Sequence, residues 1–236
     1  MLGLSSSVLG SSYISMDLKD ATTDLELWLK NDTGVTTAKW DDSSGNDNHA
    51  TQSTESNQAA VSGGGLDFEA GESDHYDLTS TITIANQGGF CLAMVVELET
   101  LSGTVLSKNA FDQFRFVDGT KFRFRSDTSD VTTDFVFESG TFDTSKALFL
   151  LNKTSGASNK FTFMKNGTTL TADVDNSTNE AGGENPGGFD LNVLGAKQGS
   201  SQFFDGKILE LAFWSKGLNA QEIADVNSYL QGIHGL

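Results

Sequence analysis

The chain has little cysteine and little proline. Its 236 residues include one cysteine, Cys91, which excludes an intrachain disulfide and a thiolate metal cluster. Cys91 lies within the apolar run 89–96, where a thiol behaves as a small hydrophobic side chain, so we expect it to be buried and unreactive. One proline and 25 glycines argue against a proline-rich linker and favour many glycine-bearing turns.

Positive charge is also scarce. Lysine and arginine together number 15, against 32 aspartates and glutamates, and the net charge is −17. Such a surface repels phosphate backbones, so we expect no binding to DNA or RNA. Attraction to cations or basic partners is one use of this charge. Prevention of association along sheet edges is the other.

The sequence lacks the short motifs of several enzyme classes. No serine or cysteine stands in a G-x-S-x-G turn, no H-x-x-x-H pair is present, and no glycine-rich phosphate loop opens a helix. We therefore expect no organic cofactor and no zinc.

The first 23 residues differ from the rest of the chain. No positive charge precedes Lys19, and serine and glycine interrupt the apolar residues, so this stretch does not fit a signal peptide or a membrane span. We expect an extended or flexible arm over 1–23, followed by a single domain over 24–236. The side chains of the arm that we expect to contact a partner are Leu2, Leu4, Val8, Leu9, Tyr13 and Ile14.

From residue 24 onward, short apolar runs alternate with turn signals. Their spacing of about 8–12 residues predicts a β-sandwich, and no longer repeat indicates a propeller or a solenoid. The run 90–98 is apolar enough to lie in the middle of a sheet. The sequences VDGT at 117–120 and KNGT at 165–168 predict hairpin turns. Residues 41–65 are rich in Asp, Ser, Asn and Gly, which predicts a long loop with at most one short strand.

The chain closes with a strand followed by a helix. Strict alternation predicts one strand face made of Ile208, Glu210, Ala212 and Trp214, and an opposite face made of Leu209, Leu211 and Phe213. Asn219 and Glu222 have the spacing of a capping box at a helix start. Ile223, Val226 and Leu230 then recur at helical spacing. We expect a short amphipathic helix that covers the sandwich and is not its core.

Three segments together resemble the laminin-G-like, concanavalin A-like jelly-roll domains. The closing segment contains FDGKILELAFW, and residues 39–51 read KWDDSSGNDNHAT, similar to the loop that opens these domains. The third segment is GLDF at 65–68 with DHYDL at 74–78, although Glu69 and Ala70 replace the usual Asp-Gly. The resemblance covers roughly residues 24–232. It implies an all-β jelly-roll sandwich of two antiparallel sheets with one short C-terminal helix.

Glycosidases of the laminarinase type share this fold and need acids that alternate along one strand. Asp24 with Glu26 and Glu97 with Glu99 each supply two acids on one face, but each pair lacks the third acid of the family pattern. The resemblance therefore implies a protein that is not an enzyme.

The same resemblance suggests two kinds of ligand. Sandwiches of this kind often hold Ca²⁺ at a loop edge, and the oxygen-bearing candidates are Asp41, Asp42 and Asp47, with Asn46 and Asn48 beside them. The alternative is that these side chains only close turns. Lectins on this fold use an aromatic ring on an edge loop. The candidate rings, Trp28, Trp40, Trp214 and Tyr229, all match positions that look structural in the family.

The opening MLGL with its Ser/Gly-rich continuation also resembles the N-termini of tail and capsid-associated proteins of marine bacteriophages. This likeness implies a virion structural protein, either a capsid decoration or a tail or fibre component. Such a protein would be assembled in the host cytoplasm, docked through its arm to other virion proteins, and homo-oligomeric. The alternative is a lectin-like carbohydrate-binding module that recognises cell-surface glycans, with calcium as its candidate cofactor. Neither function involves membrane insertion.

Overall fold

The structure, a computed structural model, describes residues 17–108, 111–126, 131–156, 161–171, 173–175 and 187–236. Sheet A contains β1 (Leu25–Leu29), β4 (Ala60–Ser62), β5 (Gly65–Phe68), β7 (Phe90–Leu98), β12 (Ala147–Lys153), β13 (Phe161–Lys165), β14 (Thr168–Leu170) and β17 (Gly206–Trp214). Sheet B contains β2 (Lys39–Trp40), β3 (Ala50–Thr51), β6 (Tyr76–Ile84), β8 (Gly103–Ser107), β9 (Gln113–Asp118), β10 (Lys121–Ser126), β11 (Val131–Val136), β15 (Asp173–Asp175) and β16 (Phe189–Leu194). The helices are α1 (Leu18–Ala21) and α2 (Ala220–His234), with a 3-10 turn at Glu55–Asn57.

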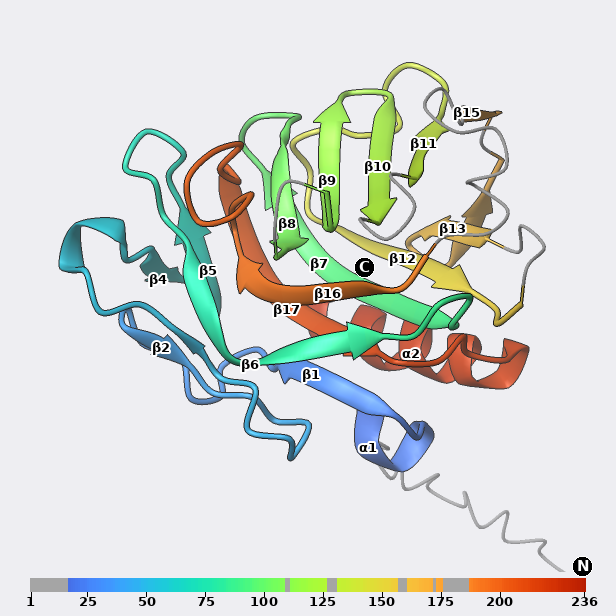
Figure 1. Cartoon of the computed structure of the whole chain (residues 1–236), viewed down its shortest axis with the longest axis horizontal. Helices are drawn as coiled ribbons and strands as arrows, with labels where there is room; N and C mark the ends of the chain where they lie inside the picture. Colours follow the sequence, from blue (N-terminus) through green and yellow to red (C-terminus); the bar gives the residue numbers. More distant parts are fainter. Residues whose placement is uncertain (1–16, 109–110, 127–130, 157–160, 172, 176–186) are drawn as a thin grey trace, which may run out of the picture.

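The strand order is that of a sandwich with crossing connections. Sheet A runs β14-β13-β12-β7-β17-β5-β4, and β1 pairs with β17 beside β5. Sheet B runs β15-β11-β10-β9-β8-β16-β6-β3-β2. Neighbouring strands pair antiparallel, as in β7 with β12 and β17 (Figure 1). These two sheets and the C-terminal helix confirm the predicted fold class, and β7 lies mid-sheet as expected.

Phenylalanine rings fill the space between the sheets. Phe124 lies 5.0 Å from Phe90 and 5.0 Å from Phe189, measured between ring centroids, and 4.9 Å from Phe114. Phe90 belongs to sheet A, and the other three rings belong to sheet B. Such aromatic pairs contribute roughly 0.5–1.5 kcal/mol each beyond the area that they bury. The phenylalanines therefore join the two sheets, as the composition predicts.

Helix α2 adds a third layer on the outer face of sheet A. A second apolar cluster joins Cys91 of β7 and Leu150 of β12 to Val226 and Leu230 of α2, and Leu18 of α1 belongs to it too. Strands β7 and β12 are consequently buried on both faces. Burial raises the pKa of the Cys91 thiol well above its usual value, which makes it the inert core residue that we expected.

The start of α2 is capped as its sequence predicts. The Asn219 side chain accepts hydrogen bonds from the backbone N–H groups of Gln221 and Glu222, at 2.9 and 3.1 Å. The Glu222 carboxylate accepts one in return from the Asn219 N–H at 2.8 Å. This reciprocal pair is the capping box, and it fixes where the helix begins. In the part of the chain that the structure describes, no helix is long and apolar enough to cross a membrane.

Two expectations about the strands are wrong. A β-bulge interrupts β17 between Ile208 and Glu210, so Ile208 joins Leu211 and Phe213 in the core between the sheets, not Trp214 on the opposite face. One extra residue in a strand inverts the alternation beyond it. The loop 41–65 contains two short strands, β3 and β4, instead of at most one.

The described end of the predicted arm packs against the sandwich. Leu18 is fully buried in the cluster beneath α2, and the Trp214 indole N–H donates to the Thr22 hydroxyl at 2.7 Å. The six side chains that we expected to contact a partner, Leu2, Leu4, Val8, Leu9, Tyr13 and Ile14, lie outside the described residues.

Candidate functional site

The chain has three arginines, Arg115, Arg123 and Arg125, and all of them lie on the neighbouring strands β9 and β10 of sheet B. They alternate with phenylalanines such as Phe114 and Phe124, which are fully buried in the core. Because successive side chains of a strand point to opposite faces, the arginines occupy the outer face of sheet B. A chain of net charge −17 thus gathers its arginines on one small surface.

Strand register continues this surface across four strands. Arg115 of β9 lies directly opposite Thr104 of β8 and Arg123 of β10, and Arg123 lies opposite Asp134 of β11. Residues directly opposite each other share a sheet face. One row therefore runs from Thr104 to Asp134, and Gln113 and Arg125 form a second pair beside it. We call Thr104, Gln113, Arg115, Arg123, Arg125 and Asp134 the arginine face.

Arg123 is held by a buried carboxylate. Its Nε donates to Asp134 Oδ1 at 2.6 Å, and its Nη2 donates to Oδ2 at 2.7 Å. The Asp134 side chain is 1% exposed, and Lys121 Nζ lies 3.5 Å from its Oδ2. A two-pronged pair of this kind is strong and fixes the plane of the guanidinium. Arg123 therefore has its position set before any ligand arrives.

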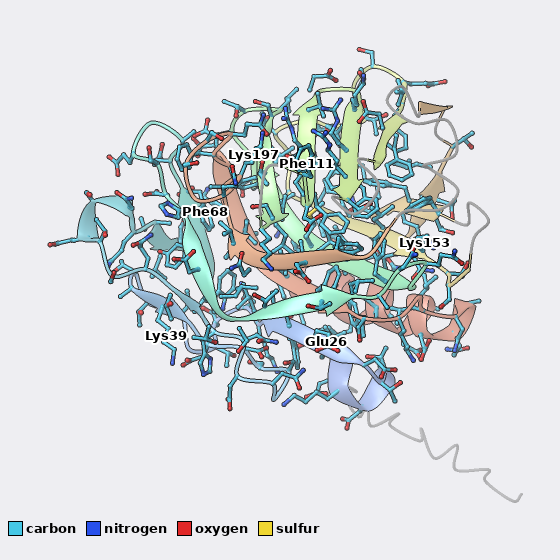
Figure 2. The ribbon with its side chains drawn as sticks, viewed as in Figure 1. Glu26, Lys39, Phe68, Phe111, Lys153 and Lys197 are labelled. Carbon is cyan, nitrogen blue, oxygen red and sulfur yellow. The ribbon has the colours of Figure 1, made fainter. Side chains whose placement is uncertain are left out.

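Arg125 is held by an aromatic ring. The centre of its guanidinium lies 4.3 Å from the centroid of the Phe111 ring, within the range of a cation–π contact. Phe111 belongs to the connection between β8 and β9, and Figure 2 labels it in the upper half of the view, near those two strands. Arg125 therefore packs against Phe111 and is not fully exposed to solvent.

Arg115 has neither of these partners. Like Arg125, it is half-buried and its Nε is buried without a hydrogen-bond partner, but among the described residues it has neither a hydrogen-bonded carboxylate nor an aromatic ring beneath it. Burial lowers the pKa of its guanidinium, the neighbouring Arg123 lowers it further, and Asp134 opposes both effects. Its positive charge is consequently less well compensated than that of Arg123.

Two polar side chains beside Arg115 also lack partners. Thr104 Oγ1 and Gln113 Oε1 are buried with no hydrogen bond, and these residues are 0% and 2% exposed. A buried polar group without a partner costs about 1–3 kcal/mol, and native structures keep few of them. Together with Arg115 Nε, they form a set of unsatisfied polar atoms buried beneath this face. The groups of the face that a ligand can reach are the partly exposed arginines.

The predicted calcium loop uses Asp42 for its own structure. The Asp42 carboxylate accepts hydrogen bonds from the backbone N–H groups of Trp28, Ser44 and Asn48 at 2.8, 2.8 and 3.0 Å. It also accepts one from the Ser44 hydroxyl at 2.7 Å. The side chain therefore organises the loop and ties it to β1, which is the turn-closing alternative.

The other two calcium candidates point elsewhere. Asp41 pairs with Lys39 at 2.5 Å, and Asp47 is largely exposed, with its Oδ1 3.8 Å from His49 Nε2. Across the described ranges, no group of three or more His, Cys, Asp or Glu side chains is placed to hold a metal ion.

The candidate aromatic rings and acid pairs also make contacts within the fold. Trp28, Trp40 and Trp214 are at most 1% exposed, so a sugar cannot stack on them, and Tyr229 packs edge-on to Trp28 at 5.9 Å. Among the acids, Glu97 lies 3.4 Å from Lys207. Asp24 precedes β1 with a φ of 61°, so it does not alternate with Glu26 along a strand as we expected.

Sequence reasoning missed the arginine face although part of its signal is visible. Arg115, Arg123 and Arg125 alternate with phenylalanine on both sides of the predicted turn at 117–120, so a hairpin must bring them to one face. The contact with Asp134 is not visible in this way, because the β10–β11 register follows from the folded sheet.

Comparison with known proteins supports this architecture. Residues 69–224 match a family model described as the concanavalin A-like lectin/glucanases superfamily. No curated protein matches the sequence. Domain 4 of AbnA, a GH43 extracellular arabinanase from Geobacillus stearothermophilus solved with arabinotriose, is similar with a TM-score of 0.55 and 15% identity over 86% of this chain and 98% of that one.

Two other similar structures come from larger proteins. The binding domain of Paraclostridial Mosquitocidal Protein 1 has a TM-score of 0.57 and 14% identity over 90% of this chain and 53% of that one. Trypanosoma rangeli sialidase in complex with sialic acid has a TM-score of 0.53 and 14% identity over 90% of this chain. The chain spans 33% of that sialidase. At these identities the likeness concerns the fold.

Proposed function

Because the chain belongs to the laminin-G-like family of the concanavalin A-like lectin/glucanases superfamily, we propose that it is a non-catalytic glycan-binding domain. In this proposal the arginine face is the surface that contacts the sugar. The observation that carries it is that the three arginines of this acidic chain lie together, partly exposed, on this one face. Their guanidinium groups can donate hydrogen bonds to the hydroxyl and acidic oxygens of a glycan.

Two similar structures agree with a binding role. The arabinanase domain was solved with arabinotriose, and the toxin fragment is named as a binding domain. Both support glycan or surface recognition more than they support a virion structural role. The glycan-binding alternative of the sequence therefore becomes our main proposal.

We propose that the arginine face is not catalytic. A glycosidase needs two carboxyl groups that flank the bond to be broken. The Asp134 carboxylate accepts both hydrogen bonds from Arg123 and is 1% exposed, so it is poorly placed to exchange protons with a substrate. We propose that Asp134 holds Arg123 in position.

A glycan array on the full chain tests the proposal, with a reducing-sugar assay on every glycan that binds. We expect binding without release of reducing sugar. Repeating the array with EDTA tests the predicted calcium at Asp41, Asp42 and Asp47, and EDTA is expected to matter only if these loop acids bind the ion. If no glycan binds in either condition, the proposal is wrong, and sugar release would replace it with a hydrolase.

The virion role remains a second proposal that the first does not exclude. A virion appendage could display the arginine face to host glycans while its arm, residues 1–23, docks on other virion proteins or on copies of itself. Deletion of residues 1–16 would abolish incorporation into particles if the arm docks the protein, and it would leave glycan binding intact.

A further inference from the structure

The geometry points to an anionic glycan as the ligand, with Arg115 binding a sugar carboxylate or sulfate. This inference rests on the proposed function, since it assigns a substrate class to the same arginine face. It concerns Arg115, which among the described residues has neither the carboxylate that holds Arg123 nor the ring that holds Arg125. Uronate and sulfated sugars share the planar or trigonal oxygens that a guanidinium binds through two parallel hydrogen bonds.

The three arginines of this face have different contacts. Arg123 donates to the buried Asp134, and Arg125 lies over Phe111, so both are occupied by the protein. Arg115 lies directly opposite Arg123, and this places two guanidinium groups next to each other with Asp134 on one side only. A neutral sugar hydroxyl would accept a hydrogen bond from the guanidinium of Arg115 but leave this positive charge unbalanced. An anion accepts the hydrogen bond and balances the charge together.

The acidic character of the whole chain does not oppose this assignment. At physiological ionic strength, charges more than about 8 Å apart are largely screened by salt. An anion bound at Arg115 therefore interacts mainly with Arg115 and with Arg123, which lies directly opposite, and Asp134 is already paired. The net charge of −17 acts on the approach of a long polyanion, not on the contact itself.

The burial of the tryptophans favours a sugar over a nucleic acid. Binding of single-stranded nucleic acid usually relies on exposed aromatic rings that stack on bases. The three tryptophans, Trp28, Trp40 and Trp214, are buried, so they provide no such platform.

Affinity electrophoresis of the full chain tests the inference with four polymers: polygalacturonate, dextran sulfate, neutral dextran and poly(dT). We expect polygalacturonate or dextran sulfate to bind about tenfold or more tightly than dextran, and the tighter of the two identifies the anion. Arg115→Gln should reduce that binding by about tenfold or more. Arg115→Lys keeps the charge but loses the two parallel donors of the guanidinium, so its affinity should lie between those of the wild type and Arg115→Gln.

Lys39→Gln provides the matched control. It removes the positive charge of Lys39 on β2, which forms an exposed ion pair with Asp41 at the opposite end of sheet B. This change should alter binding by less than about twofold. Circular dichroism of each variant separates loss of binding from loss of folding, and Arg115→Lys keeps the test decisive if Arg115→Gln does not fold.

Three results would overturn the inference. Equal binding of neutral and anionic polymers with no effect of Arg115→Gln would refute it and leave the glycan-binding proposal standing. Tighter binding of poly(dT) than of either anionic polysaccharide would assign the face to a nucleic acid. Failure to bind all four polymers and every glycan on the array would remove the proposed function as well.

Discussion

Replacement of Thr104 by valine tests the packing beneath the arginine face through stability. The Thr104 hydroxyl is buried without a hydrogen bond, and valine has nearly the same shape without the polar group. Removing an unsatisfied buried hydroxyl recovers up to its desolvation cost, about 1–3 kcal/mol. For a domain of this size, each kcal/mol raises Tm by about 2–4 °C. We therefore expect Thr104→Val to melt at least about 2 °C higher and, since Thr104 is fully buried, to keep its glycan affinity within about twofold.

Thr22 supplies the control for the same chemical change. Its hydroxyl donates to the Leu18 carbonyl at 2.7 Å and accepts from the Trp214 indole at 2.7 Å. Thr22→Val should therefore lower the free energy of unfolding by about 1–3 kcal/mol and leave glycan affinity unchanged. Thermal melts and glycan titrations of both variants provide the measurements. The reasoning fails if Thr104→Val loses stability as Thr22→Val does, or if it weakens glycan binding.

Three further predictions concern the fold. Asp42→Ala should lower the free energy of unfolding by about 2–4 kcal/mol, because three backbone N–H groups lose their acceptor. Asp47→Ala, at an exposed site, should change it by no more than about 0.5 kcal/mol. Equal effects of the two variants in urea denaturation would contradict the structural role of Asp42. Glu210→Leu should lower the free energy of unfolding by about 2–4 kcal/mol, because the buried Glu210 carboxylate is hydrogen-bonded to the Trp28 indole at 2.7 Å and to His234 Nε2 at 2.8 Å. A loss under about 0.5 kcal/mol in the same assay would show that these hydrogen bonds contribute little. Burial alone would raise the pKa of Asp190, but hydrogen bonds from Lys108 and Thr83 hold it below its usual value, so its pairing stabilises the fold above the ordinary aspartate pKa and loses that effect as pH falls through the lowered one. The stability gap between wild type and Lys108→Met should therefore close below about pH 4 in melts from neutral to acidic pH, and a constant gap would contradict this assignment.

Local signals in the sequence predict much of this fold. The turns at 117–120 and 165–168 join β9 to β10 and β13 to β14, and Asn219 with Glu222 caps α2, because each of these features depends on residues close together in the chain. The bulge in β17 is different. It depends on how β17 pairs with β7, which lies more than a hundred residues earlier, so the alternation around Ile208 could not reveal it.

The candidate site could be predicted only in part. Alternation and one hairpin are enough to bring Arg115, Arg123 and Arg125 to the same face. The ion pair between Arg123 and Asp134 cannot be predicted without the β10–β11 register. The burial of Thr104 and Gln113 without hydrogen-bond partners cannot be predicted without the packed sheet. The acidic loop 41–48 shows the opposite case. Its composition suggests a metal site, but the Asp42 carboxylate is satisfied by the loop itself.

The arginine side chains give the most direct measurement of the central claim, that the arginine face contacts glycan. Since the chain has three arginines, a ¹H–¹⁵N spectrum of their Nε–H groups contains at most three signals, and Arg115→Lys identifies that of Arg115. We expect a saturating oligosaccharide of the best-bound polymer to shift the Arg115 signal strongly and that of Arg123, which already bonds Asp134, only slightly. An Arg115 signal that does not move at saturation would contradict the account.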